Sequence, residues 1–193
     1  MNNNINKKSN EEETKMTKNM SDNIKNRIVK TGRVILKNMS IFEPRVYKNS
    51  GNSKYCATVI IPKSDRYTLR NIKQAIRIAI EDGKNLYDGK IPDISELAIP
   101  LKNGDDYSIS DIIYANSIYL NATSNYQPRV VGEQNNKLSP YNVPIDSYGE
   151  ATLLFNPYNI KTSGNKGVSC QLLEVKLLND KVNPTDMLLD YNI

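Results

Sequence analysis

The clearest pattern in the sequence is an alternation of apolar and polar residues between Tyr148 and Leu178. Successive side chains of a strand point to opposite faces, so Ala151, Leu153 and Phe155 share one face of an extended chain. A second strand-like run follows a polar stretch, residues 161–167, that contains two glycines. Two such runs around a glycine-containing turn predict a β-hairpin with one face toward a core.

Three earlier segments also have the composition of strands: Arg27–Ser40, Lys54–Ile61 and Ile112–Ser124. Turn-forming residues between positions 41 and 52 predict a loop after the first of them. A shorter strand or loop is expected around Arg129. Alternation directs one set of side chains toward the core: Ile28, Val34, Leu36, Ile118, Leu120 and Ala122.

Between the second and third segments the apolar spacing becomes helical, which predicts an amphipathic helix from about Asp65 to Tyr87 with Ser64 or Asp65 as its N-cap. Basic residues occupy another face of this helix: Arg66, Arg70, Lys73, Arg77 and Lys84. They form either a stripe that follows phosphates or a solvated surface. No aromatic residues interleave with them, which favours the solvated surface.

This order of elements predicts a mainly β fold with one main α-helix, and an OB-fold-like five-stranded β-barrel is the leading architecture. Several β-sandwiches fit the same pattern. We expect residues 1–26 to be a disordered extension rich in Asn and Lys, because that segment contains few apolar residues. The barrel domain then covers residues 27–179, and residues 180–193 form a short, weakly acidic tail.

The chain of 193 residues has 26 Lys and Arg against 21 Asp and Glu, a formal charge of +5. This balance is compatible with nucleic acid without requiring it. There is no His, and the two cysteines, Cys56 and Cys170, lie far apart. That pattern argues against a zinc site and favours buried free thiols in a reducing, cytoplasmic setting. No apolar run approaches the ~20 residues that span a bilayer.

The sequence carries no sign of catalysis. It lacks a GxSxG motif and a phosphate-binding P-loop, and Gly164-Asn165-Lys166-Gly167 has neither the glycine spacing nor the following helix of such a loop. The carboxylates of Asp105, Asp106 and Asp111 could hold Mg²⁺, although an exposed acidic turn explains them better. We therefore predict a binding protein with no cofactor and no metal.

Several segments occur in an order that resembles a family of phage single-stranded-DNA-binding proteins. They include Thr31-Gly32-Arg33-Val34, Ile60-Ile61-Pro62-Lys63-Ser64-Asp65, Asp88-Gly89-Lys90-Ile91-Pro92 and Gly164-Asn165-Lys166-Gly167-Val168. The resemblance covers about Thr31 to Leu178. It implies an OB-like barrel that coats single strands during phage replication or recombination in the host cytoplasm, in contact with replication proteins.

The chain departs from the family pattern in two places. Single-stranded-DNA-binding proteins often end in a strongly acidic segment that binds partners, whereas here only Asp180, Asp186 and Asp190 are acidic, with apolar residues between them. The helix also follows the second strand, whereas the usual OB helix lies between strands three and four. The strand count or the topology of the barrel is therefore open.

Single-strand binding needs cations for phosphates and aromatic faces for bases. The sequence has 12 tyrosines, and several stand beside basic residues. The candidate nucleic-acid-binding residues are Arg33, Lys37, Arg45, Tyr47, Lys54, Tyr55, Tyr119, Tyr126, Arg129, Tyr158, Lys161 and Lys166. The expected partner is single-stranded DNA, and a homo-oligomer is compatible with the sequence. The alternatives are a phage structural or assembly protein and an RNA-binding protein.

Overall fold

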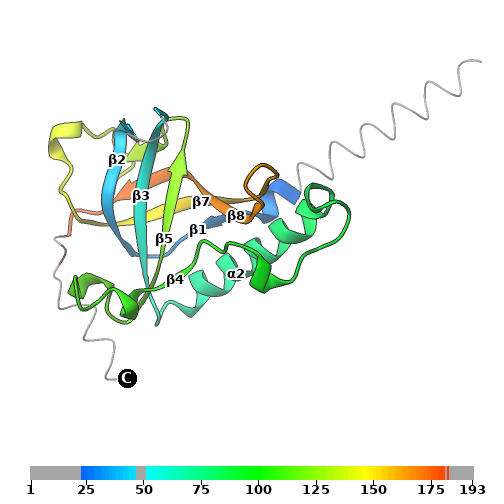
Figure 1. Cartoon of the computed structure of the whole chain (residues 1–193). Helices are drawn as coiled ribbons and strands as arrows, with labels where there is room; N and C mark the ends of the chain where they lie inside the picture. The colour runs from blue at the N-terminus through cyan, green and yellow to red at the C-terminus, as the bar shows by residue number, and fades with distance from the viewer. Residues whose placement is uncertain (1–22, 47–50, 181, 183–193) are drawn as a thin grey trace, which may run out of the picture.

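The computed structural model describes residues 23–46, 51–180 and 182, so most of the extension and of the tail lies outside the described residues (Figure 1). Five strands pair edge to edge in a closed ring, in the order β2, β3, β5, β8, β7 and back to β2. They are β2 (Val34–Val46), β3 (Ser53–Pro62), β5 (Ser117–Ser124), β7 (Ser147–Ile160) and β8 (Asn165–Leu177). This ring confirms the expected OB-like, five-stranded, mainly β architecture.

Neighbouring strands of the ring are antiparallel except β5 and β8, which meet in parallel at Thr123 and Gln171. Three short strands pair with the ring from outside: β1 (Ile28–Lys30) with β7, β4 (Lys102–Asn103) with β5 and β6 (Arg129–Val131) with β8. Single turns of 3₁₀ helix lie in the connections: η1 (Gly83–Tyr87), η2 (Ile94–Glu96), η3 (Gly104–Asp106), η4 (Ile112–Tyr114) and η5 (Pro140–Asn142).

The interior of the ring follows the alternation of the sequence. Ala151, Leu153 and Phe155 of β7 are buried, and Leu120 and Ala122 of β5 pack in the same cluster. Of the other residues expected inside, Val34 and Leu36 are buried and Ile118 is half-buried. The β7–β8 hairpin is also confirmed, with Gly164 at a φ of +68° in its turn, a conformation that glycine adopts without strain.

Three boundaries differ from expectation. The first predicted strand breaks at residues 31–33, and Ile28 is exposed because Val29 takes the buried position in β1. The predicted loop after residue 40 is shorter, because β2 continues to Val46. Two register shifts interrupt β2: one between Lys37 and Ser40, where Asn38 has a φ of +52°, and one between Ser40 and Arg45, which accommodates Pro44 because proline has no N–H to donate. The strand β5 begins at Ser117 rather than Ile112, because the Asp111 side chain accepts from the Ile113 N–H and starts η4.

The main helix, α2 (Arg66–Asp82), follows β3 and packs against β1, β7 and β8 (Figure 1). Asp65 is its N-cap and accepts a hydrogen bond from the Thr68 N–H at 2.9 Å. The buried side chains of α2 join the core cluster of the ring. The helix ends at Asp82, earlier than expected, where Gly83 lies so close to Pro157 that a Cβ would approach it to 2.6 Å. The helix thus follows the second strand of the ring, and the ring still has the five strands of an OB fold.

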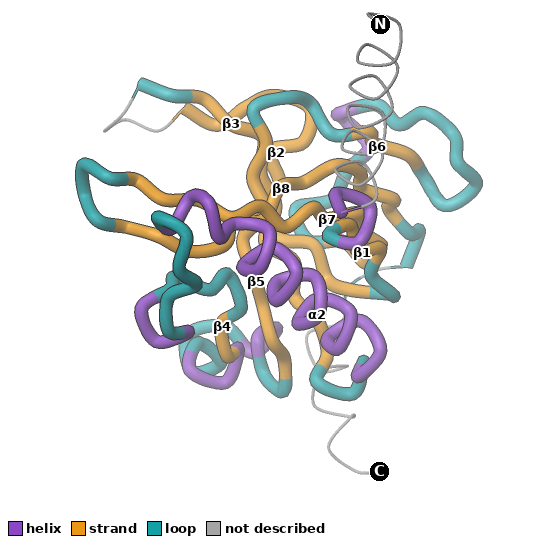
Figure 2. Tube along the Cα trace, turned by 90° about the vertical axis from the view of Figure 1, so that its right-hand side faces the viewer, coloured by secondary structure: helices purple, strands orange, loops and turns teal. Residues whose placement is uncertain are grey.

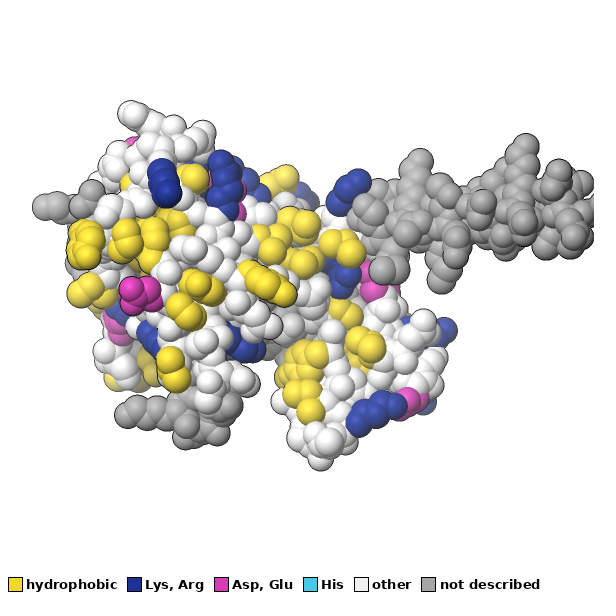
Figure 3. Space-filling view, turned by 90° about the horizontal axis from the view of Figure 1, so that it is seen from above, with side chains coloured by type: hydrophobic (Ala, Val, Ile, Leu, Met, Phe, Trp, Pro, Cys, Tyr) yellow, Lys and Arg dark blue, Asp and Glu magenta, His cyan; other side chains and the backbone are white. Residues whose placement is uncertain are grey.

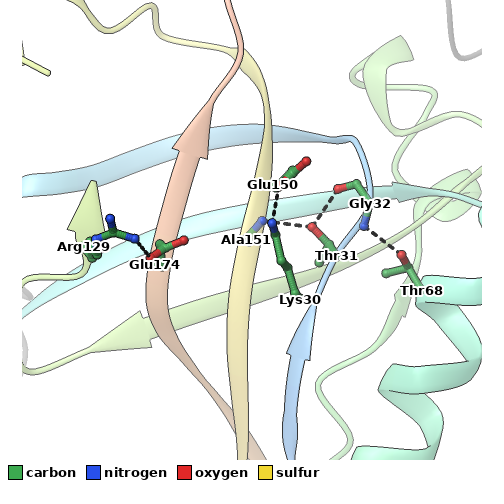
Figure 4. Close-up of polar contacts among 8 residues, drawn as sticks. All are labelled: Lys30, Thr31, Gly32, Thr68, Arg129, Glu150, Ala151 and Glu174. Carbon is green, nitrogen blue, oxygen red and sulfur yellow. Dashed lines mark hydrogen bonds and ion pairs between the residues drawn. The ribbon is translucent and has the colours of Figure 1, made fainter. Parts of the chain in front are cut away.

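Thr31 joins the turn between β1 and β2 to both β7 and α2 (Figure 4). Its hydroxyl accepts from the Ala151 N–H at 2.9 Å and donates to the Gly32 carbonyl at 2.8 Å. The Gly32 N–H in turn donates to the Thr68 hydroxyl of the helix at 2.9 Å. Because Thr31 and Thr68 are buried, water cannot replace these hydrogen bonds.

We predict that Thr31→Val lowers the free energy of unfolding by about 1–3 kcal/mol, because valine keeps the shape but leaves the Ala151 N–H without its partner. Urea unfolding at neutral pH measures the change. Thr162→Val in the exposed β7–β8 turn is the matched control and should change stability by less than about 0.5 kcal/mol. Equal stability of the two variants would contradict the role of this network.

Candidate nucleic-acid interface

Two hairpins of the ring, β2–β3 and β7–β8, project to the same side of the molecule (Figure 2). In OB folds, oligonucleotides bind on the outer face of the second and third strands and on the loops between strands one and two and strands four and five. Here those strands are β3 and β5, and the two loops are the tips of these hairpins. The fold therefore places the candidate surface between the hairpins.

A polar cleft of about 300 Å³ lies on this surface. It is lined by Lys54, Thr123, Ser124, Asn125, Tyr126, Asn156, Ser169, Cys170 and Gln171. Two predicted site residues, Lys54 and Tyr126, thus come together although they lie far apart in sequence. The Tyr126 side chain is 78% exposed, so its ring is accessible for stacking. The Asn156 amide donates to Gln171 Oε1 at 3.3 Å on the opposite wall.

The β2–β3 hairpin carries two cations directly opposite each other, Arg45 and Lys54. Like charges in such cross-strand pairs destabilise a sheet, and neither side chain forms an ion pair within the described residues. An anion bound between them would relieve the repulsion. Tyr55 follows Lys54 and is half-buried, whereas Tyr47 lies outside the described residues.

The β7–β8 hairpin carries Tyr158, Lys161 and Lys166, but not on one face. Tyr158 pairs with Gly167 and shares the face of Asn156 in the cleft, whereas Lys166 pairs with Asn159 on the opposite face, toward the connection that carries Glu96. The Tyr158 hydroxyl and Asn165 Oδ1 are 3.2 Å apart across the two strands. Lys161 Nζ lies 3.2 Å from Asp88 Oδ1, and Lys166 Nζ lies 2.6 Å from Glu96 Oε2. Ion pairs this exposed contribute about 0–1 kcal/mol, so a phosphate can replace either carboxylate at small cost.

Tyr119 on the outer face of β5 belongs to a cluster of three tyrosines. Its ring centroid lies 5.0 Å from that of Tyr114 and 6.2 Å from that of Tyr107, and Lys102 Nζ lies 5.8 Å from the Tyr119 ring. Tyr107 is 53% exposed, so the cluster presents an aromatic face to solvent. The sequence pattern indicated only Tyr119. Its partners, Tyr107 and Tyr114, lie in the connection between β4 and β5, which folds back over the strand.

Asp105 holds this connection in place. Its carboxylate accepts from the Asn116 N–H at 2.7 Å and forms an ion pair with Lys63. The hydrogen bond from Lys63 keeps the pKa of Asp105 below its usual value. The carboxylates of Asp106 and Asp111 bond instead to the Asn103 amide and to Lys37. Among the described residues, no three His, Cys, Asp or Glu side chains lie together as metal ligands would.

The other predicted basic residues lie outside the space between the hairpins. Lys37 is on the outer face of β2, next to the tyrosine cluster, with Nζ 2.9 Å from Asp146 and 3.1 Å from Asp111. Arg33 pairs with Asp180 at 3.1 Å, and its guanidinium lies 4.0 Å from the centroid of the Tyr148 ring. Arg129 on β6 pairs with Glu174 of β8 (Figure 4).

The face of the molecule seen from above carries interspersed hydrophobic and basic side chains with few acidic ones (Figure 3).

The two cysteines are buried and form no disulfide, as expected, and burial raises the pKa of the Cys170 thiol. No helix in the described part of the chain is long and apolar enough to cross a bilayer.

A family model described as "Enterobacter phage Enc34, ssDNA-binding protein" matches residues 26–182. The chain belongs to this Enc34 family. The match includes the whole ring, both hairpins and α2. It confirms the family resemblance noted in the sequence, and it places the chain among binding proteins rather than enzymes.

Relatives of this Enc34-family chain come from phages. "Putative protein p50" of Acyrthosiphon pisum secondary endosymbiont phage 1 is 28% identical over 163 residues, covering 79% of this chain and 83% of that protein. The single-stranded DNA-binding protein of bacteriophage Enc34, solved in complex with ssDNA, superposes with a TM-score of 0.69 at 18% identity, covering 81% and 88% of the two chains. The single-stranded DNA-binding protein gp2.5 of bacteriophage T7 gives a TM-score of 0.57 at 19% identity, covering 83% and 96%. The two solved structures support the fold.

We predict that Lys37→Met lowers the free energy of unfolding by about 1–3 kcal/mol at pH 8, because Asp111 and Asp146 lose their charged partner. Burial alone would lower the pKa of Lys37, but hydrogen bonds with Asp146 and Asp111 outweigh it and raise the pKa above its ordinary 10.5. A raised lysine pKa adds stability below pH 10.5, and this stability is lost as pH rises through the pKa of the folded protein.

The difference in unfolding free energy between the native chain and Lys37→Met should therefore be largest at pH 8 and should shrink above pH 10.5. Urea unfolding of both proteins from pH 8 to pH 11.5 measures it, and comparison at each pH cancels the titration of other groups. A difference that stays constant across this range would show that Lys37 acts only through packing.

Proposed function

We propose that this chain binds single-stranded DNA without sequence preference on the surface between the β2–β3 and β7–β8 hairpins. The observation that carries the proposal is the polar cleft in which Lys54 of one hairpin meets Asn156 of the other hairpin and the exposed Tyr126, with further cations on both hairpins. Arg45 and Lys54 stand on one hairpin, and Lys161 and Lys166 on the other. Tyr126 lies at the cleft beside Lys54, and the Tyr107–Tyr119 face lies toward the other end of β5, where Tyr119 pairs with Ile60.

This arrangement suits a single strand better than a duplex. Unpaired bases can stack on tyrosine rings, each stack being worth about 1–3 kcal/mol, and every base offers such a face. Lysine and arginine bind the backbone phosphates, which carry no sequence information. The family of the chain and the fold it shares with the Enc34 protein in complex with ssDNA support the same ligand.

The proposed setting is phage DNA replication or recombination in the host cytoplasm, because the relatives are phage proteins. Contacts with phage replication proteins, and association of several copies along one strand, fit this role. Of the twelve residues expected from the sequence, the proposal places Arg45, Lys54, Tyr119, Tyr126 and Lys166 nearest the strand. Tyr55, Tyr158 and Lys161 stand beside them, and Tyr47 lies outside the described residues. Lys37, Arg33 and Arg129 hold structural ion pairs.

The affinity for an oligo-dT strand should fall as salt rises, with a slope in log affinity against log salt of about −3 if four cations contact phosphates, because each contributes about −0.7 on a single strand. Lys54→Ala with Lys166→Ala should reduce the slope by about 1.4. Fluorescence anisotropy between 50 and 400 mM NaCl measures it. Lys30→Ala with Lys176→Ala, at the far end of the β7–β8 pairing, is the matched control and should leave the slope unchanged.

Salt-insensitive or undetectable binding to oligo-dT would refute single-strand binding and favour a structural or assembly protein. The same titration with an RNA strand and a DNA duplex of equal length decides between the remaining ligands. Tighter binding to RNA would replace the proposed ligand with RNA on the same surface, since stacking tolerates either sugar.

The tyrosines should contribute through stacking. Tyr119→Ala with Tyr158→Ala should weaken oligo-dT binding by about 2–6 kcal/mol in total, while far-UV circular dichroism stays native. Tyr141→Ala is the control, because its side chain is 96% exposed on the η5 connection and lies outside the proposed surface. Native affinity in the double variant would remove these two residues from the site.

A further inference from the structure

An apolar groove of about 530 Å³ runs between α2 and the connection from Ile91 to Leu101. Its aliphatic lining consists of Ile76, Ile80, Ile91, Pro92, Ile94, Leu97, Ile99 and Leu101. Ile94 is 63% exposed and Ile91 is 42% exposed, so the wall facing the helix leaves large aliphatic surface in water. Such surface is unfavourable in a free molecule and marks a binding groove.

The helix side of the groove carries cations without counterions. Lys73 and Arg77 stand at its rim, and Arg66 and Arg70 continue the row along a second groove of about 580 Å³. None of these four side chains forms an ion pair within the described residues. Like charges three or four residues apart on a helix repel each other, so this face favours a ligand that brings negative charge.

The chemistry of the two grooves selects a peptide over a nucleic acid. Neither groove is lined by an aromatic side chain, so bases would find no ring on which to stack. Aliphatic side chains fill the apolar groove, and carboxylates beside them meet Lys73 and Arg77. Glu81 is the acidic residue in the lining and stands at the far end of the helix from Arg66. The fitting ligand is an aliphatic peptide that carries carboxylates.

We propose that residues 185–193 of the same chain bind in this groove. Their sequence is Thr-Asp-Met-Leu-Leu-Asp-Tyr-Asn-Ile, in which three consecutive aliphatic side chains stand between two carboxylates. Met187, Leu188 and Leu189 enter the apolar groove, and Asp186 and Asp190 pair with the cations on its rim. The aliphatic side chains match the apolar lining of the groove, and the two carboxylates match the cations on its rim.

The segment is long enough to reach the groove. Val182 packs against the outer cluster that contains Ile35 and Ile60, and residues 183–193 follow it. Met187 and Leu189 lie five and seven residues after Val182, so an extended chain at 3.3–3.6 Å per residue carries them up to about 17–18 Å and about 23–25 Å from it. Tyr119 packs against the same cluster as Val182 and pairs with Lys102, the residue after Leu101 of the groove, so one end of the groove lies near the start of this segment. A short tether also gives an effective concentration in the millimolar range, so a weak contact is populated within one molecule.

The groove is separate from the proposed DNA surface. The connection that forms its outer wall pairs with β8 at Ala98 and Gly167, and this wall stands between the groove and the β7–β8 hairpin. Binding of the segment therefore needs no hairpin cation, and the inference stands or falls independently of DNA binding.

The test is methyl NMR of the full chain with labelled isoleucine, compared with the variant Leu188→Ser/Leu189→Ser. The Ile91 and Ile94 signals should shift toward water-exposed values in the variant, while Ile61 inside the ring stays unchanged. A synthetic peptide of residues 183–193, added at millimolar concentration, should restore the original signals. Lys73→Glu/Arg77→Glu should raise the dissociation constant of that peptide at least about tenfold.

The matched control is Asn183→Ser/Asn192→Ser, which changes the same segment without touching its aliphatic run and should keep native signals. Identical Ile91 and Ile94 signals in the native chain and Leu188→Ser/Leu189→Ser would overturn the proposal, as would shifts confined to the two hairpins. Shifts that grow between 20 and 500 µM protein would show that the segment comes from a second copy, which overturns binding within one chain.

Discussion

The structure depends on the close approach of three strands at Gly149. At this residue β7 pairs with Val34 of β2 on one side and with Leu177 of β8 on the other, which closes the ring. A Cβ here would lie 2.5 Å from Leu36 Cδ1 and 2.6 Å from the Lys176 carbonyl oxygen. Real Cβ atoms do not approach other atoms so closely, so only glycine lets β7 exchange partners at this point. Without this crossing the sheet would keep two open edges.

Closure of the ring also fixes the candidate surface. The strands are long enough for two hairpins to extend beyond the core, and the ring directs both to the same side (Figure 2). The core cluster is aliphatic and buried, so the polar chemistry collects on these extensions and on the outer face of β5. Arg45 and Lys54 on paired strands, with Tyr126 just after β5, form a surface whose spacing is set by the strand register of the barrel.

Apolar alternation and turn glycines predicted the features that depend on neighbouring residues in the sequence. The alternation of Ala151, Leu153 and Phe155 identified the buried face of β7, and the glycines near position 164 identified its turn. The end of β2 was not predicted, because a bulge between Ser40 and Arg45 lets Pro44 remain in the strand. The partners of Lys37 were not predicted either. Asp111 and Asp146 lie far along the chain, so no spacing in the sequence indicates that they neutralise this lysine. The same holds for Tyr107, which reaches Tyr119 only because its connection folds back.

One short connection contributes to both the β7–β8 hairpin surface and the apolar groove. Asp88 and Glu96, which hold Lys161 and Lys166, flank the residues from Ile91 to Ile94 that form the wall of the apolar groove. The Tyr87 hydroxyl, which donates to the Gly167 carbonyl at 3.0 Å, and the pairing of Ala98 with Gly167 also hold this connection to the hairpin. The same connection therefore carries the counterions of two hairpin lysines and the wall of the groove, so a substitution within it reaches both surfaces.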